Sequence, residues 1–404
     1  MPNLHKNMSV NYNGESPQDG GTAGVQVMVI PSIFYFLYYG AISILTPYLA
    51  LFYQSRGMTG GQIGLLAAIS PIISFFGAPL WTGAADASHR HKLVAMLAII
   101  GVVIVSFIFP NVASFGGLLL MIILYSIFNA PTGSLVDSAV LALLGERKER
   151  YGRVRLWGTI GYGAVAPFAG DLIGRLGLKW AFWGYAILML AGLLVITQIP
   201  FRQSHSDGSF RGGVRELLTN QPWMLFLVMV FIAGIGMATI NNYLFVYMQS
   251  LGASKTLMGF ALTISTISEV PAMFFSDRML RRFGARGMLV IAMTTIGLRL
   301  IGYSLTTQPW VVLVIQLCHG LTFAAIYTAG VHYADQVAPP GMKATTQGMF
   351  GGTLMGFGSA AGGLLGGLLL DHYSPGGMYA FTGALVLVGL ITFLLVERRL
   401  VAKS

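Results

Sequence analysis

Charge is scarce in this chain of 404 residues: only 9% of them are Asp, Glu, Lys or Arg, against about 25% in a typical soluble domain. Cysteine is nearly absent as well. The single one, Cys318, lies in an apolar run, so no intramolecular disulfide can form, and we expect its thiol to pack among apolar side chains. These shortages exclude a soluble globular domain and a disulfide-stapled scaffold.

Several catalytic and nucleotide-binding patterns are missing too. The string GFGSAAGG (356–363) lies within an apolar run and not after a strand, so it does not match a dinucleotide-binding loop, and its glycines are expected to let helices pack closely. No G-x-x-x-x-G-K-[ST] string is present, which argues against direct drive by ATP and favours an ion gradient. No Ser/His/Asp or Cys/His arrangement indicates an enzyme, and His89 and His91 alone are too few for a metal site. We therefore expect no enzymatic activity, no cofactor and no metal.

The chain is instead rich in long hydrophobic segments, and 55% of its residues are hydrophobic. A membrane-spanning helix needs about 20 mostly apolar residues, and such segments recur with short breaks. The pattern predicts an all-α membrane protein with about twelve transmembrane helices, at 29–54, 61–84, 92–111, 115–144, 153–174, 179–199, 222–250, 255–280, 286–305, 309–337, 343–370 and 375–397.

The twelve predicted helices fall into two similar sets of six. GAADASHRHK after the second helix and FFSDRMLRRFGAR after the eighth each place an Asp before a basic cluster. Such a repeat predicts two pseudo-symmetric six-helix bundles, an arrangement typical of transporters. The predicted domains are a disordered tail without an apolar signal region, a first bundle, a linker, a second bundle and a second tail, at 1–28, 29–199, 200–221, 222–397 and 398–404.

The basic residues give an orientation. Loops on the side of the termini hold nearly all the Lys and Arg, whereas the opposite loops hold only Arg56, Arg175, Lys179 and Lys255. Because basic loops stay in the cytoplasm during insertion, both termini are predicted to be cytoplasmic. The net charge of +10 then reflects topology, and since the basic residues form no surface interleaved with aromatics, no nucleic acid is expected as a partner.

Three ionisable residues of the second bundle lie at membrane depth: Glu269, Arg299 and His319. Arg299 lies ten residues before a turn near Pro309 and His319 ten after it, so both should lie about 15 Å from the outer surface. An acid, a base and an imidazole at one level could bind and release a proton. The alternative is a static, charge-neutral structural cluster.

The first bundle has a similar pattern with other residues. Asp137 and Arg155 are 18 residues apart, symmetric about a turn near Glu146, and could hold substrate hydroxyls, the acid accepting and the guanidinium donating. Tyr162, two turns beyond Arg155, offers a ring for stacking. The alternative is a salt bridge at a helix end and an arginine that anchors the loop. The aromatic run FYFLYYG supplies Phe34, Tyr35, Tyr38 and Tyr39. Tyr35 and Tyr38 are predicted to contact substrate, and others of the run to contact lipid or neighbouring helices.

From about residue 29 to 397 the chain resembles the major facilitator superfamily. The resemblance rests on the two halves and on the loops with Asp86 and Arg90 and with Asp277 and Arg278, although His89 stands where the loop motif has Gly. More narrowly, FNAPTGSLVD…YGRVRLWGTIGY and SEVPAMFF…GLRLIGYS…LCHG resemble the oligosaccharide:proton symporters typified by lactose permease, and the phenylpropionate-permease-like group. The resemblance implies alternating access, with the four loop residues acting in gating.

The resemblance also implies roles for the membrane-embedded residues. Asp137 and Arg155 would be the substrate-binding pair and Tyr162 the stacking aromatic. Glu269 would join substrate recognition to coupling. The coupling cluster would also contain Arg299 and His319.

The chain departs from lactose permease near the histidine. Thr322 replaces an acid one turn after it, Gln316 replaces a lysine one turn before it, and the seventh helix has Asn241 and Asn242 where the permease is acidic. The two asparagines are predicted to contact substrate. Because these acidic and basic residues are replaced, the proton site must be simpler, with Glu269 as the first predicted carrier and His319 as the second.

The leading prediction is a proton-coupled symporter that imports a small polar solute, such as a sugar, glycoside or nucleoside-like compound. A drug or metabolite exporter of the same fold, or an importer of an aromatic acid, is an alternative, and a non-transporting membrane sensor is a more distant one. The predicted partners of the symporter are the solute, protons and the lipid bilayer. We expect a monomer in a bacterial cytoplasmic (inner) membrane.

Overall fold

The structure is a computed structural model that describes residues 22–199, 201 and 214–401, and all regular elements among these residues are helical. In chain order they are α1 (Thr22–Leu45), η1 (Thr46–Tyr48), α2 (Leu49–Ser55), α3 (Gly60–Ser88), α4 (His91–Ile108), η2 (Phe109–Asn111), α5 (Phe115–Leu144), η3 (Gly145–Arg150), α6 (Tyr151–Leu176), α7 (Lys179–Ile196), α8 (Val214–Thr219), α9 (Gln221–Ser250), α10 (Lys255–Phe274), α11 (Ser276–Leu305), α12 (Pro309–Gln316), α13 (Gly320–Val337), α14 (Lys343–Gly351), η4 (Gly352–Gly358), α15 (Ser359–His372) and α16 (Pro375–Val401).

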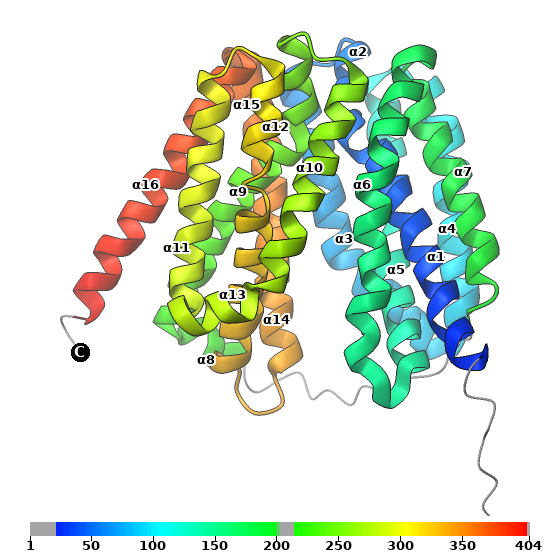
Figure 1. Ribbon diagram of the computed structural model, residues 1–404, viewed down its shortest axis with the longest axis horizontal. Helices are drawn as coiled ribbons and strands as arrows, with labels where there is room; N and C mark the ends of the chain where they lie inside the picture. Colours follow the sequence, from blue (N-terminus) through cyan, green and yellow to red (C-terminus); the bar gives the residue numbers. More distant parts are fainter. Residues whose placement is uncertain (1–21, 200, 202–213, 402–404) are drawn as a thin grey trace, which may run out of the picture.

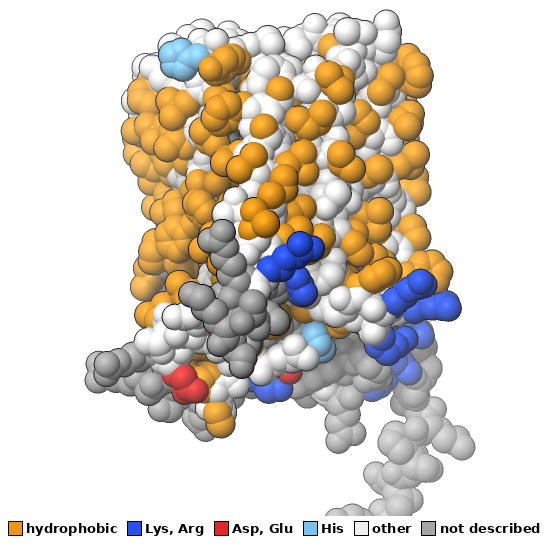
Figure 2. Space-filling model, turned by 90° about the vertical axis from the view of Figure 1, so that its left-hand side faces the viewer, with side chains coloured by type: hydrophobic (Ala, Val, Ile, Leu, Met, Phe, Trp, Pro, Cys, Tyr) orange, Lys and Arg blue, Asp and Glu red, His pale blue; other side chains and the backbone are white. Residues whose placement is uncertain are grey.

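The predicted membrane fold is confirmed. Within the described residues, 11 helical spans are long and apolar enough to cross a membrane. The remaining long helix, α6, has 26 residues but carries Arg153, Arg155, Asp171 and Arg175, which make it more polar. Together with α6, the described part of the chain has twelve segments long enough to cross a membrane. In Figure 2 hydrophobic side chains cover most of the height, and the acidic and basic ones gather toward the lower edge.

The helices form two groups, α1 to α7 on the right and α9 to α16 on the left of Figure 1. Helix α1 begins and α16 ends at the same, lower side, here called the termini face; the other side is the opposite face. Helix α1 begins at Thr22, within the predicted tail 1–28, and α16 continues to Val401, within the predicted tail 398–404. Most of the predicted linker 200–221 lies outside the described residues, and α8 belongs to the described part. The domain boundaries remain predictions.

Two predicted helix ends need correction. The helix predicted at 255–280 ends at Phe274, and the one predicted at 286–305 begins at Ser276. The residues between the predicted helices form a short first segment of α11, which is horizontal at the bottom of Figure 1. Gly284, with φ of 65°, ends this segment because a left-handed backbone interrupts a helix and favours glycine. Its mixture of charged and apolar residues suits a helix that lies at the membrane surface.

The helix predicted at 309–337 is broken into α12 and α13, and His319 lies at the break. The amide of Gly320 donates to Ser268 Oγ of α10 at 3.1 Å, while Ser268 Oγ lies 3.3 Å from the carbonyl oxygen of Gln316. The side chain of Ser268 therefore takes the place of one backbone hydrogen bond within the helix. A hydrogen-bonding group inserted in this way is a common cause of a helix break.

The glycine-rich helix predicted at 343–370 consists of α14, η4 and α15, and η4 is a π-helix. A Cβ atom on Gly362 would overlap the carbonyl oxygen of Ile235, and the Cα of Gly358 lies 3.0 Å from the Cβ position of Gly234. Helix α9 can approach this segment only because these positions lack a side chain. The predicted packing role of the glycines is confirmed.

The two halves meet closely toward the opposite face. A Cβ atom on Gly170 of α6 would overlap the carbonyl oxygen of Lys255 of α10, and one on Gly60 of α3 would overlap that of Gly367 of α15. The Asp371 carboxylate of α15 accepts hydrogen bonds from the amides of Gly60 at 2.5 Å and Gly61 at 2.6 Å. The carboxylate thus caps the N-terminus of α3 from the other half of the molecule, where a negative charge is favourable.

Candidate functional site

A cavity of about 320 Å³ lies between the two halves and is called the central cavity. Six of the predicted site residues line it: Arg155, Tyr162, Asn241, Asn242, Glu269 and His319. The rest of its lining comes from the same bundles: Tyr39, Ile42, Thr46, Pro47, Thr159, Leu244, Phe245, Leu262, Ser265, Thr266, Gln316 and Phe323. Among all of these residues Glu269 is the acid and Arg155 the permanent cation. The cavity can therefore hold a ligand that is polar on two sides.

Arg155 is presented to the cavity by Tyr39 of α1. Its guanidinium carbon lies 3.9 Å from the centre of the Tyr39 ring, and Nη2 donates to the Tyr39 hydroxyl at 2.5 Å. Gly158, one turn after Arg155 on α6, leaves room for this ring, since a Cβ atom there would lie 2.6 Å from Tyr39 Cδ2. The arginine is half-buried, so part of its donor fork remains available to a ligand.

The expected pairing of Asp137 with Arg155 is indirect. The Asp137 carboxylate accepts a hydrogen bond from the Tyr35 hydroxyl at 2.5 Å, and the Tyr35 ring lies 5.5 Å from the Arg155 guanidinium carbon. Tyr35 is therefore placed between the two charges. Tyr35 and Tyr38 are buried, with 1% and 6% of their surface exposed, and neither they nor Asp137 line the central cavity. Tyr38 packs on Phe34, with rings stacked 5.9 Å apart.

Arg299 and His319 lie together, as their matching depth predicted. Nη1 of Arg299 is 3.4 Å from His319 Nδ1 and donates to Thr322 Oγ1 at 3.0 Å. Nη2 donates to Gln316 Oε1 at 2.5 Å and to the Tyr303 hydroxyl at 3.2 Å. Arg299 is only 3% exposed and does not line the cavity. It stands behind His319 and Gln316, which do.

Glu269 lies one position after Ser268, the residue that bridges the break beside His319. Its half-buried side chain shares the cavity with Arg155 on the facing bundle and with His319 on its own. Contacts between α10 and α13 join the two helices around this point. A shift of α10 would therefore move the backbone beside His319 through the hydrogen bond from the Gly320 amide to Ser268 Oγ, as well as change the shared cavity.

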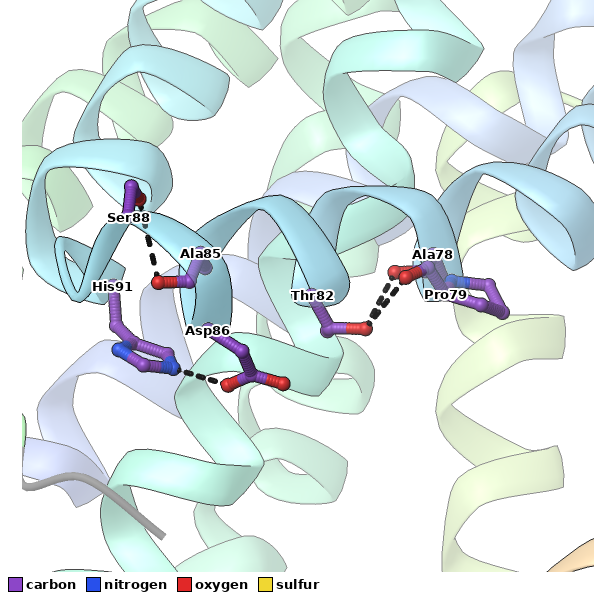
Figure 3. A network of polar contacts seen from close by, with 7 residues as sticks. All are labelled: Ala78, Pro79, Thr82, Ala85, Asp86, Ser88 and His91. Carbon is purple, nitrogen blue, oxygen red and sulfur yellow. Dashed lines mark hydrogen bonds and ion pairs between the residues drawn. The ribbon is translucent and has the colours of Figure 1, made fainter. Parts of the chain in front are cut away.

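The predicted gating residues lie far from the cavity, at the termini face. Figure 3 shows the end of α3, where Asp86 Oδ1 lies 2.6 Å from His91 Nε2. His89 ends α3 with φ of 54°, a conformation that favours the glycine usual in this motif. Arg90 directly precedes α4. Asp277, followed by Arg278, lies in the first turn of α11, where its negative charge is favourable near the helix N-terminus.

The sequence prediction omitted Tyr303 and Ser268, which shape the site, and named Tyr39 only as a member of the aromatic run FYFLYYG. Tyr39 lies one helical turn after Tyr35 on the same face, so the spacing could have indicated it. Tyr303 lies one turn after Arg299 and could have been found in the same way. Ser268 carries no comparable signal, because its role depends on how α10 meets the broken helix.

Comparisons with known proteins place the chain among transporters. The model of the MFS_1 like family matches residues 28–381. "Maltose permease" of Geobacillus stearothermophilus is 26% identical over 93% of this chain and 96% of its own length. The "Probable 3-phenylpropionic acid transporter" of Escherichia coli is 26% identical over 74% of this chain and 80% of its own. A solved structure of a variant of the nucleoside transporter NupG superposes with a TM-score of 0.84 at 18% identity, covering 91% of this chain and 99% of that one, which shows the same fold.

Proposed function

The chain belongs to the MFS_1 like family, and we propose that this major facilitator superfamily transporter is a proton-coupled symporter that imports a small polar solute such as a sugar, glycoside or nucleoside. The observation that carries the proposal is the central cavity, which contains Glu269, Arg155 and His319 between the two halves. Relatives named for maltose and 3-phenylpropionic acid, and a neighbour named for nucleosides, support a solute of this size. The carrier works as a monomer in a bacterial cytoplasmic membrane, with both termini in the cytoplasm.

In the proposed cycle, Glu269 takes up a proton while the cavity is open to the outside. The solute then binds between Arg155 and Tyr162 of the first bundle and the side chains of Glu269 and Asn242 of the second. Arg155 donates to solute oxygens, Tyr162 stacks on a ring, and Asn242 and its neighbour Asn241 donate and accept. The described structure, joined by Gly60 and Asp371 at the opposite face, corresponds to the state that faces the cytoplasm.

Solute and proton leave on the cytoplasmic side. The positive charge of Arg299, which lies behind His319, then favours loss of the proton from Glu269 by stabilising its anion. Asp137 acts through Tyr35, since it fixes the ring that lies beside Arg155. As the halves rock back, the loops with Asp86 and Arg90 and with Asp277 and Arg278 control closure of the termini face.

The proposal is tested with right-side-out membrane vesicles under an imposed proton gradient. Uptake of radiolabelled maltose, uridine and 3-phenylpropionate is measured for the wild type and for Glu269→Gln, which keeps the shape of the side chain but cannot titrate. We expect the wild type to accumulate one of these compounds, and Glu269→Gln to equilibrate it without accumulation. Glu216→Gln, an exposed change on α8, is the matched control and should accumulate the compound normally.

Two results would overturn the proposal. Accumulation by Glu269→Gln at the wild-type level would show that this carboxyl group does not carry the proton. Extrusion of the compounds in place of uptake would support an exporter of the same fold.

A further inference from the structure

Beside the central cavity lies a second cavity of about 300 Å³, here called the side cavity. It extends between α1, α2, α3 and α5 of the first bundle, and Asn242 of α9 and Met355 of η4 line it from the second. Its lining is Ile42, Thr46, Leu49, Ala50, Tyr53, Ile63, Leu66, Ala67, Ser70, Pro71, Ser74, Ile122, Tyr125, Ser126, Asn129, Asn242 and Met355. The two cavities have similar volumes, each within the range of small-molecule sites.

The two cavities adjoin each other. Ile42, Thr46 and Asn242 line both of them, so these three side chains form the boundary. A ligand with two linked rings could place one ring in each cavity, with the linkage beside Thr46 and Asn242. A ligand of one ring would occupy the central cavity and leave the side cavity empty.

The side cavity differs in chemistry from the central one, because none of its lining residues carries a charge. Its polar groups are hydroxyls and amides. The hydroxyl oxygens of Ser70 and Ser126 lie 2.5 Å apart, and Asn129 Oδ1 accepts a hydrogen bond from the Tyr185 hydroxyl at 3.3 Å. The remaining wall is aliphatic and aromatic. A phosphate or carboxylate there would lack a counter-charge and lose its hydration, whereas a hydroxylated ring meets donors, acceptors and apolar surface.

One group in the side cavity lacks a partner. The Tyr53 side chain lines the cavity and is 1% exposed, and its hydroxyl makes no hydrogen bond in the structure. A buried hydroxyl without a hydrogen-bond partner destabilises the folded protein. A ligand hydroxyl would supply the missing partner. The vacant hydrogen-bonding capacity of Tyr53 thus points to a polar, neutral occupant.

We infer that the side cavity is a second substrate subsite, which holds the neutral hydroxylated ring of a two-ring solute whose other ring lies in the central cavity. This inference rests on the proposed function of the central cavity, and it narrows the solute to neutral glycosides, including disaccharides and nucleosides. Tyr53, Ser126 and Asn129 are the residues that determine this specificity.

The test measures binding by thermal stabilisation of the detergent-purified protein, a readout that does not depend on proton coupling. The probes are two matched pairs, maltose with glucose and uridine with ribose. The variants are Tyr53→Phe and Ser126→Ala. Tyr379→Phe is the matched control, since the Tyr379 hydroxyl is equally buried and unpartnered but lies on α16, outside both cavities.

We expect one two-ring probe to stabilise the wild type at concentrations at least about tenfold lower than its one-ring counterpart. Tyr53→Phe and Ser126→Ala should each raise the half-stabilising concentration of the two-ring probe about tenfold and leave that of the one-ring probe unchanged. Without ligand, Tyr53→Phe should melt at the same temperature as the wild type or higher, because it removes an unpartnered hydroxyl. Tyr379→Phe should leave the affinity for both probes unchanged.

The inference is overturned if no two-ring probe stabilises the wild type, or if the variants weaken both members of a pair equally. Failure of the proposed function looks different. In that case Glu269→Gln would still accumulate the compound in vesicles, while the contrast between one-ring and two-ring probes would persist.

Discussion

The two halves of the molecule each bury an arginine beside a tyrosine, and they do so in different ways. Arg155 is half-buried, donates to Tyr39 and faces the central cavity. Arg299 is 3% exposed, and its two terminal nitrogens contact four side chains of its own bundle. An arginine whose terminal nitrogens bond to several buried side chains of its own bundle stabilises the fold, whereas one that faces a cavity can bind a ligand. We therefore assign to Arg299 a role in stabilising the fold, and to Arg155 a role in binding the solute.

The two roles are tested most directly by removing each arginine and measuring the free energy of unfolding. Arg299→Met should lower the free energy of unfolding by about 3 kcal/mol, because Gln316, Thr322 and Tyr303 lose their buried donor. Arg155→Met should lower it by less than about 1 kcal/mol, since water in the cavity can replace the lost contacts. Unfolding of the detergent-solubilised proteins measures both values. A larger loss for Arg155→Met would reverse the assignment.

Ligand affinity should show the opposite order. Arg155→Met should weaken binding of the stabilising probe by about 30-fold, since a hydrogen bond to a charged donor contributes about 1.5–3 kcal/mol. Arg155→Lys should recover part of the loss, because it keeps the charge but not the planar fork. Isothermal titration provides the dissociation constants. Wild-type affinity in Arg155→Met would exclude Arg155 from the binding site.

The tyrosine partners of the two arginines, Tyr39 and Tyr303, should differ in the same way. Tyr39→Phe should weaken probe binding about fivefold, because Arg155 keeps the aromatic ring but loses the hydroxyl that orients it. Tyr303→Phe should instead lower the free energy of unfolding by about 1 kcal/mol without affecting the affinity of the folded protein. Both variants are measured by the same titration and unfolding assays. A similar loss of affinity in both would indicate that the two halves contribute alike.

The smallest expected effect concerns the helix break beside His319. Ser268→Ala should lower the free energy of unfolding by about 1 kcal/mol or less, because the Gly320 amide loses its acceptor. Hydrogen exchange of the amides at 317–323 should become faster. Ser304→Ala is the control, since Ser304 bonds only to the carbonyl of Ile301 in its own helix. Unchanged exchange in Ser268→Ala would mean that the break persists without the serine.

The sequence predicted what local patterns determine and missed what depends on contacts between helices. The twelve crossings follow from apolar runs, each of which needs no knowledge of its neighbours. The closeness of Arg299 and His319 follows from equal depth on adjacent helices. The break at His319 could not be predicted, because Ser268 lies on another helix.

The indirect relation of Asp137 to Arg155 was missed for a similar reason. Their spacing along the chain predicted two charges that face each other, and it contained no information about α1. Tyr35 enters from that helix and lies between them. Charged pairs predicted from spacing therefore need to be checked against the aromatic residues of the neighbouring helices.

The carboxylate of Asp371 has a consequence for the speed of transport. It holds the amides of Gly60 and Gly61 across the boundary of the two halves, at the face away from the termini. If every turnover opens that face, both hydrogen bonds must break each time, whatever the solute. Hydrogen bonds to a charged group contribute about 1.5–3 kcal/mol each. The maximal turnover rate is therefore limited in part by the contact of Asp371 with Gly60 and Gly61, which lies outside the solute site.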